Sequence, residues 1–231
     1  MDAPLSIPPA DRKASAFAML RGFATSRRAA PEERCELCGL TLAPEHRHLL
    51  ERTTRKILCS CDACGLRFEN VIDGRFKLIP RDARALPDFQ LTDAQWDALS
   101  LPINLAFFFY DSPGMRMTAL YPSPAGATES LLPLSAWESL VADNPVLATL
   151  APDVETLLVN RVGNRRFYAI APIDVCFELV GLIRIHWRGL SGGEEVWREI
   201  EKFFARVEDR ARSPSPREQL LPAEVSTEVA P

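Results

Sequence analysis

The spacing of apolar residues near the end of the chain is helical. They recur every three or four positions between residues 196 and 207, which places them on one face of a helix with 3.6 residues per turn. These residues are Val196, Trp197, Ile200, Phe203, Phe204 and Val207. A second apolar arc comprises Cys176, Leu179, Val180, Ile183 and Trp187. Asp174 stands where it would cap the helix that carries this arc. We therefore predict two amphipathic helices in this region.

Two pairs of apolar segments, each joined by turn-forming residues, predict β-hairpins. The pairs are 103–110 with 116–121, and 155–161 with 165–170. The first turn contains Asp-Ser-Pro-Gly at 111–114, and the second contains Gly163-Asn164, which suits the positive φ angles of a tight turn. The predicted order is therefore two strands and a helix, twice over, with an extra closing helix.

Capping boxes mark two further helix starts. In this motif a Ser or Thr side chain accepts a hydrogen bond from the amide three residues on, and a Glu or Gln there reaches back. Thr92 with Gln95 and Ser135 with Glu138 have this spacing. The patterns together predict an α+β domain over residues 90–212, with two β-hairpins and C-terminal amphipathic helices. We call it the large domain.

The two ends of the chain have a different character. Residues 1–30 are rich in Ala, Pro, Ser and Arg, and we expect a flexible arm with one short helix carrying Phe17, Leu20 and Phe23. Residues 213–231 begin with Ser-Pro-Ser-Pro and hold few large apolar residues, so a disordered tail is expected there.

Charge and hydropathy narrow the classes of function. The 231-residue chain has a formal net charge of -4, which gives no general attraction to nucleic acid or anionic lipid. Apolar runs fall short of the roughly 18 residues needed to cross a bilayer. The first residues contain acids and prolines and do not resemble a signal peptide. We expect a cytoplasmic protein without membrane insertion.

The cysteines carry the clearest chemical signal. Cys35-Glu-Leu-Cys38-Gly39 and Cys61-Asp-Ala-Cys64-Gly65 each hold two thiols two residues apart, followed by glycine. We call each such turn a knuckle, and residues 31–80 the cysteine module. Two knuckles offer four soft ligands in a tetrahedral array, which suits Zn²⁺ or a single iron. We predict a zinc-ribbon-like site, with rubredoxin-like iron as the alternative because rubredoxin has the same glycine knuckles.

A fifth cysteine and two histidines lie between the knuckles. Cys59 would point to the same side of an extended strand as Cys61, and His46 and His48 would share one face of another strand. Three interpretations stay open for Cys59: an additional or alternative ligand of the first site, a packing thiol, or a ligand of a second ion together with His46 and His48. Basic residues at 46–56 could contact phosphate, but interleaved glutamates argue against nucleic acid.

Catalytic chemistry finds little support in the large domain. Cys176 and His186 are its candidate nucleophile and base, but ten residues along one helix separate them by about 15 Å. Cys176 is better explained as a small apolar residue of the helix stripe. A zinc-dependent hydrolase would need an open coordination position on the metal, and the two complete knuckles leave none.

Several motifs resemble those of a bacterial family of unknown function. They are CELCG at 35–39, EHRHLL at 45–50, LCSCDAC at 58–64, LTDAQWDAL at 91–99, LVGLIR at 179–184 and WRGLSGG at 187–193. Members of that family are often encoded near nickel-iron hydrogenase genes, which implies an accessory role in assembly, maturation or electron delivery. We therefore expect a non-catalytic, zinc-stabilised accessory protein that binds a hydrogenase subunit or assembly factor. The alternative is a rubredoxin-like one-electron carrier.

Overall fold

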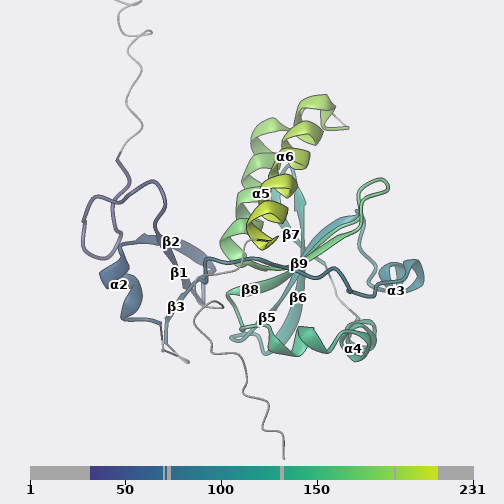
Figure 1. The fold of residues 1–231 in the computed structure, drawn as a ribbon, viewed down its shortest axis with the longest axis horizontal. Helices are drawn as coiled ribbons and strands as arrows, with labels where there is room; N and C mark the ends of the chain where they lie inside the picture. Colours follow the sequence, from purple (N-terminus) through teal and green to yellow (C-terminus); the bar gives the residue numbers. More distant parts are fainter. Residues whose placement is uncertain (1–31, 70, 72–73, 131–132, 190, 213–231) are drawn as a thin grey trace, which may run out of the picture.

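The computed structural model describes residues 32–69, 71, 74–130, 133–189 and 191–212. Within them the strands form two antiparallel sheets, and the smaller sheet lies beside the larger one (Figure 1). The α+β class, the N-terminal four-cysteine cluster and the C-terminal helices are thereby confirmed. The predicted arm at 1–30 and the predicted tail at 213–231 lie outside the described residues.

The cysteine module is built on a three-stranded sheet with the order β2-β1-β3. Its strands are β1 (Arg47–Glu51), β2 (Lys56–Ser60) and β3 (Phe76–Leu78). Arg55, with φ of 57°, closes the short turn between β1 and β2. The one-turn helix α2 (Asp62–Leu66) follows β2 directly and starts at the second knuckle, with Cys61 as its N-cap.

The large domain contains a six-stranded sheet with the order β4-β9-β8-β5-β6-β7. Its strands are β4 (Arg84–Ala85), β5 (Leu105–Asp111), β6 (Arg116–Ser123), β7 (Gly126–Ser130), β8 (Glu155–Asn160) and β9 (Phe167–Pro172). Both predicted hairpins are present as β5–β6 and β8–β9, and they pair with each other through β5 and β8. Two edge strands, β4 and β7, were not predicted.

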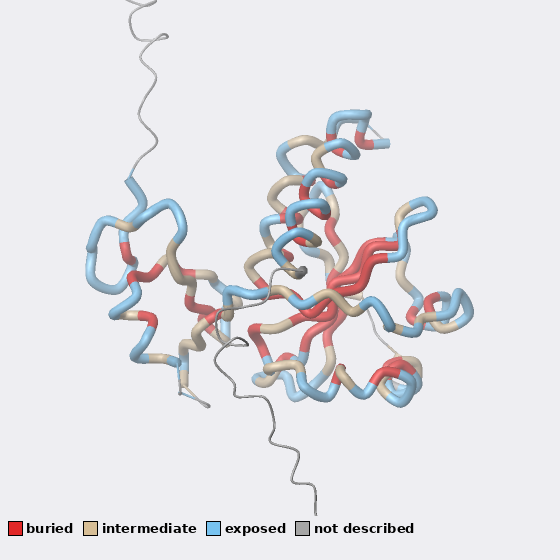
Figure 2. Tube along the Cα trace, in the orientation of Figure 1, coloured by how far each residue is buried: buried red, intermediate tan, exposed pale blue. Residues whose placement is uncertain are grey.

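Helices cover both faces of this sheet (Figure 1). The helices are α3 (Asp93–Ala98), α4 (Leu134–Asp143), the 3-10 helix η1 (Pro145–Thr149), α5 (Ile173–His186) and α6 (Gly193–Arg212). Alternate residues of β5 point to opposite faces: Phe107 and Phe109 pack with α5 and α6, whereas Phe108 packs with α3 and α4. Figure 2 shows the resulting concentration of buried residues in the central strands.

The helix starts test three predicted caps. The Thr92–Gln95 capping box is present in full at the start of α3. The box predicted for Ser135 and Glu138 is wrong, because the N-cap of α4 is Pro133, two residues before Ser135, and it makes no side-chain capping bond. Asp174 is not the N-cap of α5 either. Pro172 takes that place, and Asp174 lies in the first turn of the helix.

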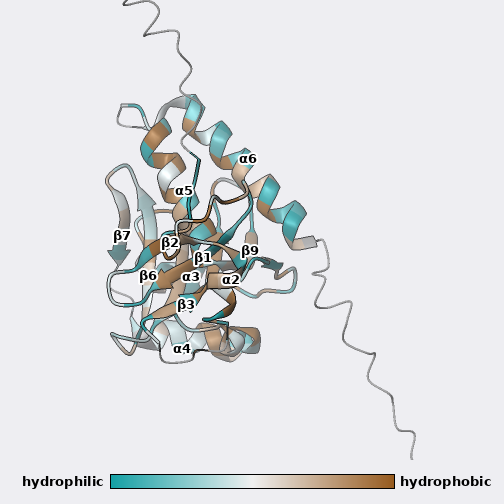
Figure 3. Ribbon diagram, turned by 90° about the vertical axis from the view of Figure 1, so that its left-hand side faces the viewer, coloured by the Kyte–Doolittle hydropathy of each residue, from teal (hydrophilic) through white to brown (hydrophobic). Residues whose placement is uncertain are grey.

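The predicted apolar stripe of α6 is buried against α5 and the sheet, apart from Trp197, which is 39% exposed. Figure 3 shows the two sides of this helix, one hydrophobic and one hydrophilic. Among the described residues, none of the helices combines the length and hydrophobicity that a membrane span requires.

Candidate metal centre

The two knuckles meet at one point of the cysteine module. The sulfur atoms of Cys35, Cys38, Cys61 and Cys64 all lie within 4.8 Å of one another. An amide–carbonyl bond from Glu36 to Cys59, 2.9 Å long, ties the first knuckle to β2, and β2 leads straight into the second knuckle. The four predicted ligands are thus brought together from two segments more than twenty residues apart.

Each knuckle is closed by the same backbone hydrogen bond. The amide of Gly39 donates to the carbonyl of Cys35 at 2.8 Å, and the amide of Gly65 donates to the carbonyl of Cys61 at 2.9 Å. Gly39 has φ of 78°, the left-handed conformation expected after a knuckle. Gly65 differs in that a Cβ there would lie 2.8 Å from Cδ of Arg47, so a larger residue would require the arginine side chain to shift.

The thiols differ in acidity before any ion binds. Burial opposes ionisation of Cys35, but backbone hydrogen bonds at Cys61, Leu37 and Cys38 outweigh it and lower the pKa of this thiol to about 6. Hydrogen bonding with the sulfur of Cys61, and then with that of Cys38, favours the protonated form of Cys64 and raises its pKa to about 12. A bound cation would displace the remaining protons, because a metal takes the thiolate form.

The donor set fits a tetrahedral ion. A metal–sulfur distance of about 2.3 Å implies sulfurs about 3.8 Å apart in a tetrahedron, and Sγ of Cys38 lies 3.7 Å from Sγ of Cys61. All six cysteines are free thiols, so disulfides do not explain the approach of the four sulfurs. Thiolate ligands select zinc or iron over oxygen-preferring ions. The arrangement is a four-cysteine cluster able to bind a metal ion.

Cys59 does not join this group. Its sulfur lies with the ring nitrogens of His46 and His48, all within 4.8 Å of one another. Burial, followed by the negative charges of Glu33 and Glu36, raises the pKa of the Cys59 thiol. Of the three interpretations left open by the sequence, the geometry separates Cys59 from the first site and groups it with both histidines.

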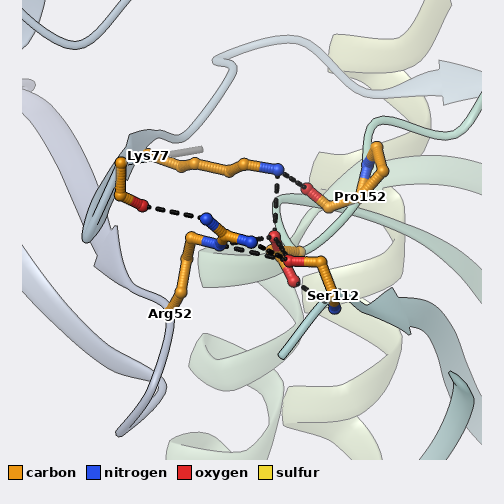
Figure 4. Close-up of polar contacts among 6 residues, drawn as sticks. Arg52, Lys77, Ser112 and Pro152 are labelled. Atoms are coloured by element: carbon orange, nitrogen blue, oxygen red, sulfur yellow. Dashed lines mark hydrogen bonds and ion pairs between the residues drawn. The ribbon is translucent and has the colours of Figure 1, made fainter. Parts of the chain in front are cut away.

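Polar contacts join the cysteine module to the large domain, and sequence reasoning missed them. Arg52 of the β1–β2 turn donates to Oγ of Ser112 at 2.6 Å, and Nζ of Lys77 lies 2.9 Å from a carboxylate oxygen of Asp153 (Figure 4). Lys77 also donates to the carbonyl of Pro152 at 3.1 Å. Asp153 has φ of 71°, an unusual backbone angle for a residue other than glycine, and its side chain is buried.

The catalytic candidates of the large domain are not brought together. Cys176 is fully buried, and burial raises the pKa of its thiol to about 12. Its sulfur lies 3.0 Å from the hydroxyl of Thr156. His186 lies at the other end of α5, where Nδ1 is 3.0 Å from a carboxylate oxygen of Glu195. Cys176 is a packing residue of the core, as the apolar stripe predicted.

Comparison with known proteins places this fold in a family. Neither the curated proteins nor the solved structures gave a significant match. The model of a family of unknown function, DUF5947, matches residues 34–211, which include both knuckles and nearly all of the large domain. This match covers well over half of the chain, and the chain therefore belongs to the DUF5947 family of unknown function.

Proposed function

We propose that the protein is a non-catalytic accessory protein whose cysteine module, folded around one Zn²⁺, docks a protein partner. The partner class follows from the family resemblance drawn from the sequence motifs: a subunit of a nickel-iron hydrogenase or one of its assembly factors. The zinc has a structural role in this proposal, and the surface beside it makes the contact.

Exposed leucines around the cysteine cluster carry the proposal. Leu37, Leu40 and Leu66 are 42%, 59% and 53% exposed. Leu37 lies inside the first knuckle, and the other two each follow a ligand cysteine by two residues. Single exposed leucines are ordinary, but three held next to one rigid site offer apolar area that a partner can bury.

A bound metal would fix the positions of these leucines. Each leucine lies within two residues of a cysteine of the cluster. Four metal–sulfur bonds would therefore hold all three side chains at a fixed spacing. Preorganisation of this kind lowers the entropy lost on binding. Loss of the metal should therefore weaken partner binding even where the leucines themselves are unchanged.

The test is binding of the zinc-loaded chain to purified hydrogenase subunits and assembly factors from the same organism. We expect the double variant Leu37→Ser with Leu40→Ser to weaken binding by at least about tenfold, because burying one leucine side chain contributes about 1.5–3 kcal/mol. Met115→Ser is the matched control, since Met115 is 79% exposed on the large domain. Equal affinity of the double variant and the wild type, or failure of every such protein to bind, would contradict the proposal.

A second candidate is supported by the exposure of the cluster. Cys38 is exposed and Cys64 is half-buried, so a partner could approach the sulfurs directly. Iron held by four thiolates there would transfer one electron, as rubredoxin does. Elemental analysis and a visible spectrum of the same purified sample distinguish the candidates: zinc without iron and no colour supports the adaptor, whereas one iron with thiolate-to-iron bands supports the carrier.

A further inference from the structure

Two histidines and one cysteine converge beside the four-cysteine cluster. His48 on β1 lies directly opposite Cys59 on β2 in the strand register, and His46 precedes His48 by two residues. Side chains two residues apart on extended chain share a side. The two imidazole rings pack edge to face with centroids 4.8 Å apart, and the ligand atoms of all three residues lie within 4.8 Å of one another.

Both imidazoles are oriented through the same ring nitrogen. Nδ1 of His46 lies 3.0 Å from the carbonyl oxygen of Ala43, and Nδ1 of His48 lies 2.7 Å from a carboxylate oxygen of Asp174. A metal-binding histidine almost always donates its second ring N–H to a carbonyl or a carboxylate, which fixes the tautomer and leaves the other nitrogen free for the ion. Both histidines have this arrangement, with Nε2 as the free atom.

The free nitrogen of His46 has no partner that explains its burial. The His46 side chain is only 7% exposed and its Nε2 atom is fully buried. This atom nevertheless has no hydrogen-bond partner among the described residues. Buried polar nitrogens are nearly always hydrogen-bonded or bound to an ion. A cation between His46, His48 and Cys59 would satisfy this atom.

We propose that His46, His48 and Cys59 form a second metal site that binds Zn²⁺ through two imidazole nitrogens and one thiolate. Zinc is the borderline-soft ion that takes this mixed set, with ligand distances of about 2.0–2.3 Å. The carboxylate of Asp174 and the thiolate together balance the charge of the ion. Three protein ligands leave a fourth position open for water or for a donor group of a bound partner.

Asp174 gives the second site a role that the first lacks. It belongs to α5 of the large domain, whereas all three ligands belong to the cysteine module. The His48–Asp174 bond therefore joins the two parts of the protein, and an ion on His48 strengthens that bond by polarising the imidazole N–H. Occupancy of this site should hold the module against the large domain.

The test counts metal ions on the full chain. Protein equilibrated with excess zinc sulfate and desalted should hold two Zn²⁺ per chain, whereas Cys59→Ser and His48→Ala should each hold one. Asp174→Asn should keep both ions but weaken the second site 10–100-fold in competition with a colorimetric chelator. His186→Ala is the matched control, because His186 also pairs with a carboxylate and lies far along α5 from Asp174.

The number of Zn²⁺ ions bound to the wild type and to each variant decides the proposal. One Zn²⁺ on the wild type, or two on both Cys59→Ser and His48→Ala, would overturn the proposal. If a ligand variant loses both ions, it has disrupted the whole module, and Asp174→Asn then decides because it changes the large domain instead. Unchanged zinc affinity in Asp174→Asn would in that case overturn the second site, while leaving the four-cysteine site and the proposed partner binding untouched.

Discussion

The cysteine module and the large domain are stabilised by different means. The large domain buries aromatic and aliphatic side chains on both faces of its sheet. The described part of the module has four buried aliphatic residues, Leu49, Leu50, Leu58 and Ile79, and two of these, Leu50 and Ile79, belong to the core of the large domain. The apolar interior that remains to the module alone is Leu49 and Leu58 with the buried cysteines Cys35 and Cys61.

The free energy of folding therefore comes from a different source in each of the two parts. A segment of this size with so little apolar interior cannot offset the conformational entropy of ordering its chain. Metal binding can, because a site absent from the unfolded chain adds its binding free energy to folding, about 10–16 kcal/mol in zinc-finger peptides. The module should depend on its ion, and the large domain on its core.

The largest expected effect is loss of a knuckle ligand. Cys61→Ser should abolish metal binding at the four-cysteine site and unfold the module, leaving the large domain folded. Limited proteolysis followed by mass spectrometry should find new cleavage within residues 34–79 and a resistant fragment that contains 90–212. Cys176→Ser is the control, because it removes a buried thiol that is no ligand. Unchanged protease resistance after chelation would refute the dependence on metal.

The reverse experiment removes core from the large domain. Phe108 is fully buried and stacks on Trp137, with ring centroids 5.7 Å apart. Phe108→Ala should lower the free energy of unfolding by about 3–5 kcal/mol through lost burial and the cavity left behind. Metal content of the folded protein should not change. Denaturant titration measures the loss, and exposed Met115→Ala should stay within about 0.5 kcal/mol of the wild type.

A smaller effect is expected at the contact between the two parts. Burial alone would raise the pKa of Asp153, but hydrogen bonds from Ser112 and the ammonium group of Lys77 outweigh it and lower the pKa. A lowered pKa means that the folded state favours the carboxylate. The stabilisation is therefore complete above the usual carboxyl pKa of about 4 and is lost as the pH falls below it.

Asp153→Asn should cost about 1–2 kcal/mol at neutral pH and flatten the acid limb of the stability curve. Denaturant titrations of both proteins from neutral to acid pH measure this. Exposed Asp97→Asn provides the control for the loss of one carboxylate. Parallel acid limbs for the wild type and Asp153→Asn would show that Asp153 does not carry the pH dependence.

The sequence predicted those features that depend on residues close together in the chain. The two hairpins followed from apolar runs and turn residues, and the four-cysteine site followed from spacing alone. The edge strand β7 (Gly126–Ser130) was missed because its sequence has no apolar run. Its residues alternate between half-buried and exposed, so the strand does not need one. The roles of Asp153 and Asp174 depend on Lys77 and His48, each far away in the chain, and no local pattern encodes such contacts.

The helix caps also show that residue spacing alone does not decide a structure, and the smallest expected change in stability concerns one of them. Thr92 and Ser135 have identical spacing to a glutamine or glutamate, yet only Thr92 forms the box, accepting from the amide of Gln95 at 3.2 Å. The difference lies in where the helix begins: α4 starts at Leu134, so Ser135 is already inside the first turn and does not take the N-cap position.

Thr92→Ala should therefore lower the free energy of unfolding by about 1 kcal/mol, the usual cost of a lost cap. Ser135→Ala, an exposed substitution without a capping bond to lose, should stay within about 0.5 kcal/mol. Denaturant titration of the two variants compares them directly, and equal losses would contradict the cap assignment. Neither change should alter metal content, because a cap acts on one helix end and the large domain remains held by its core.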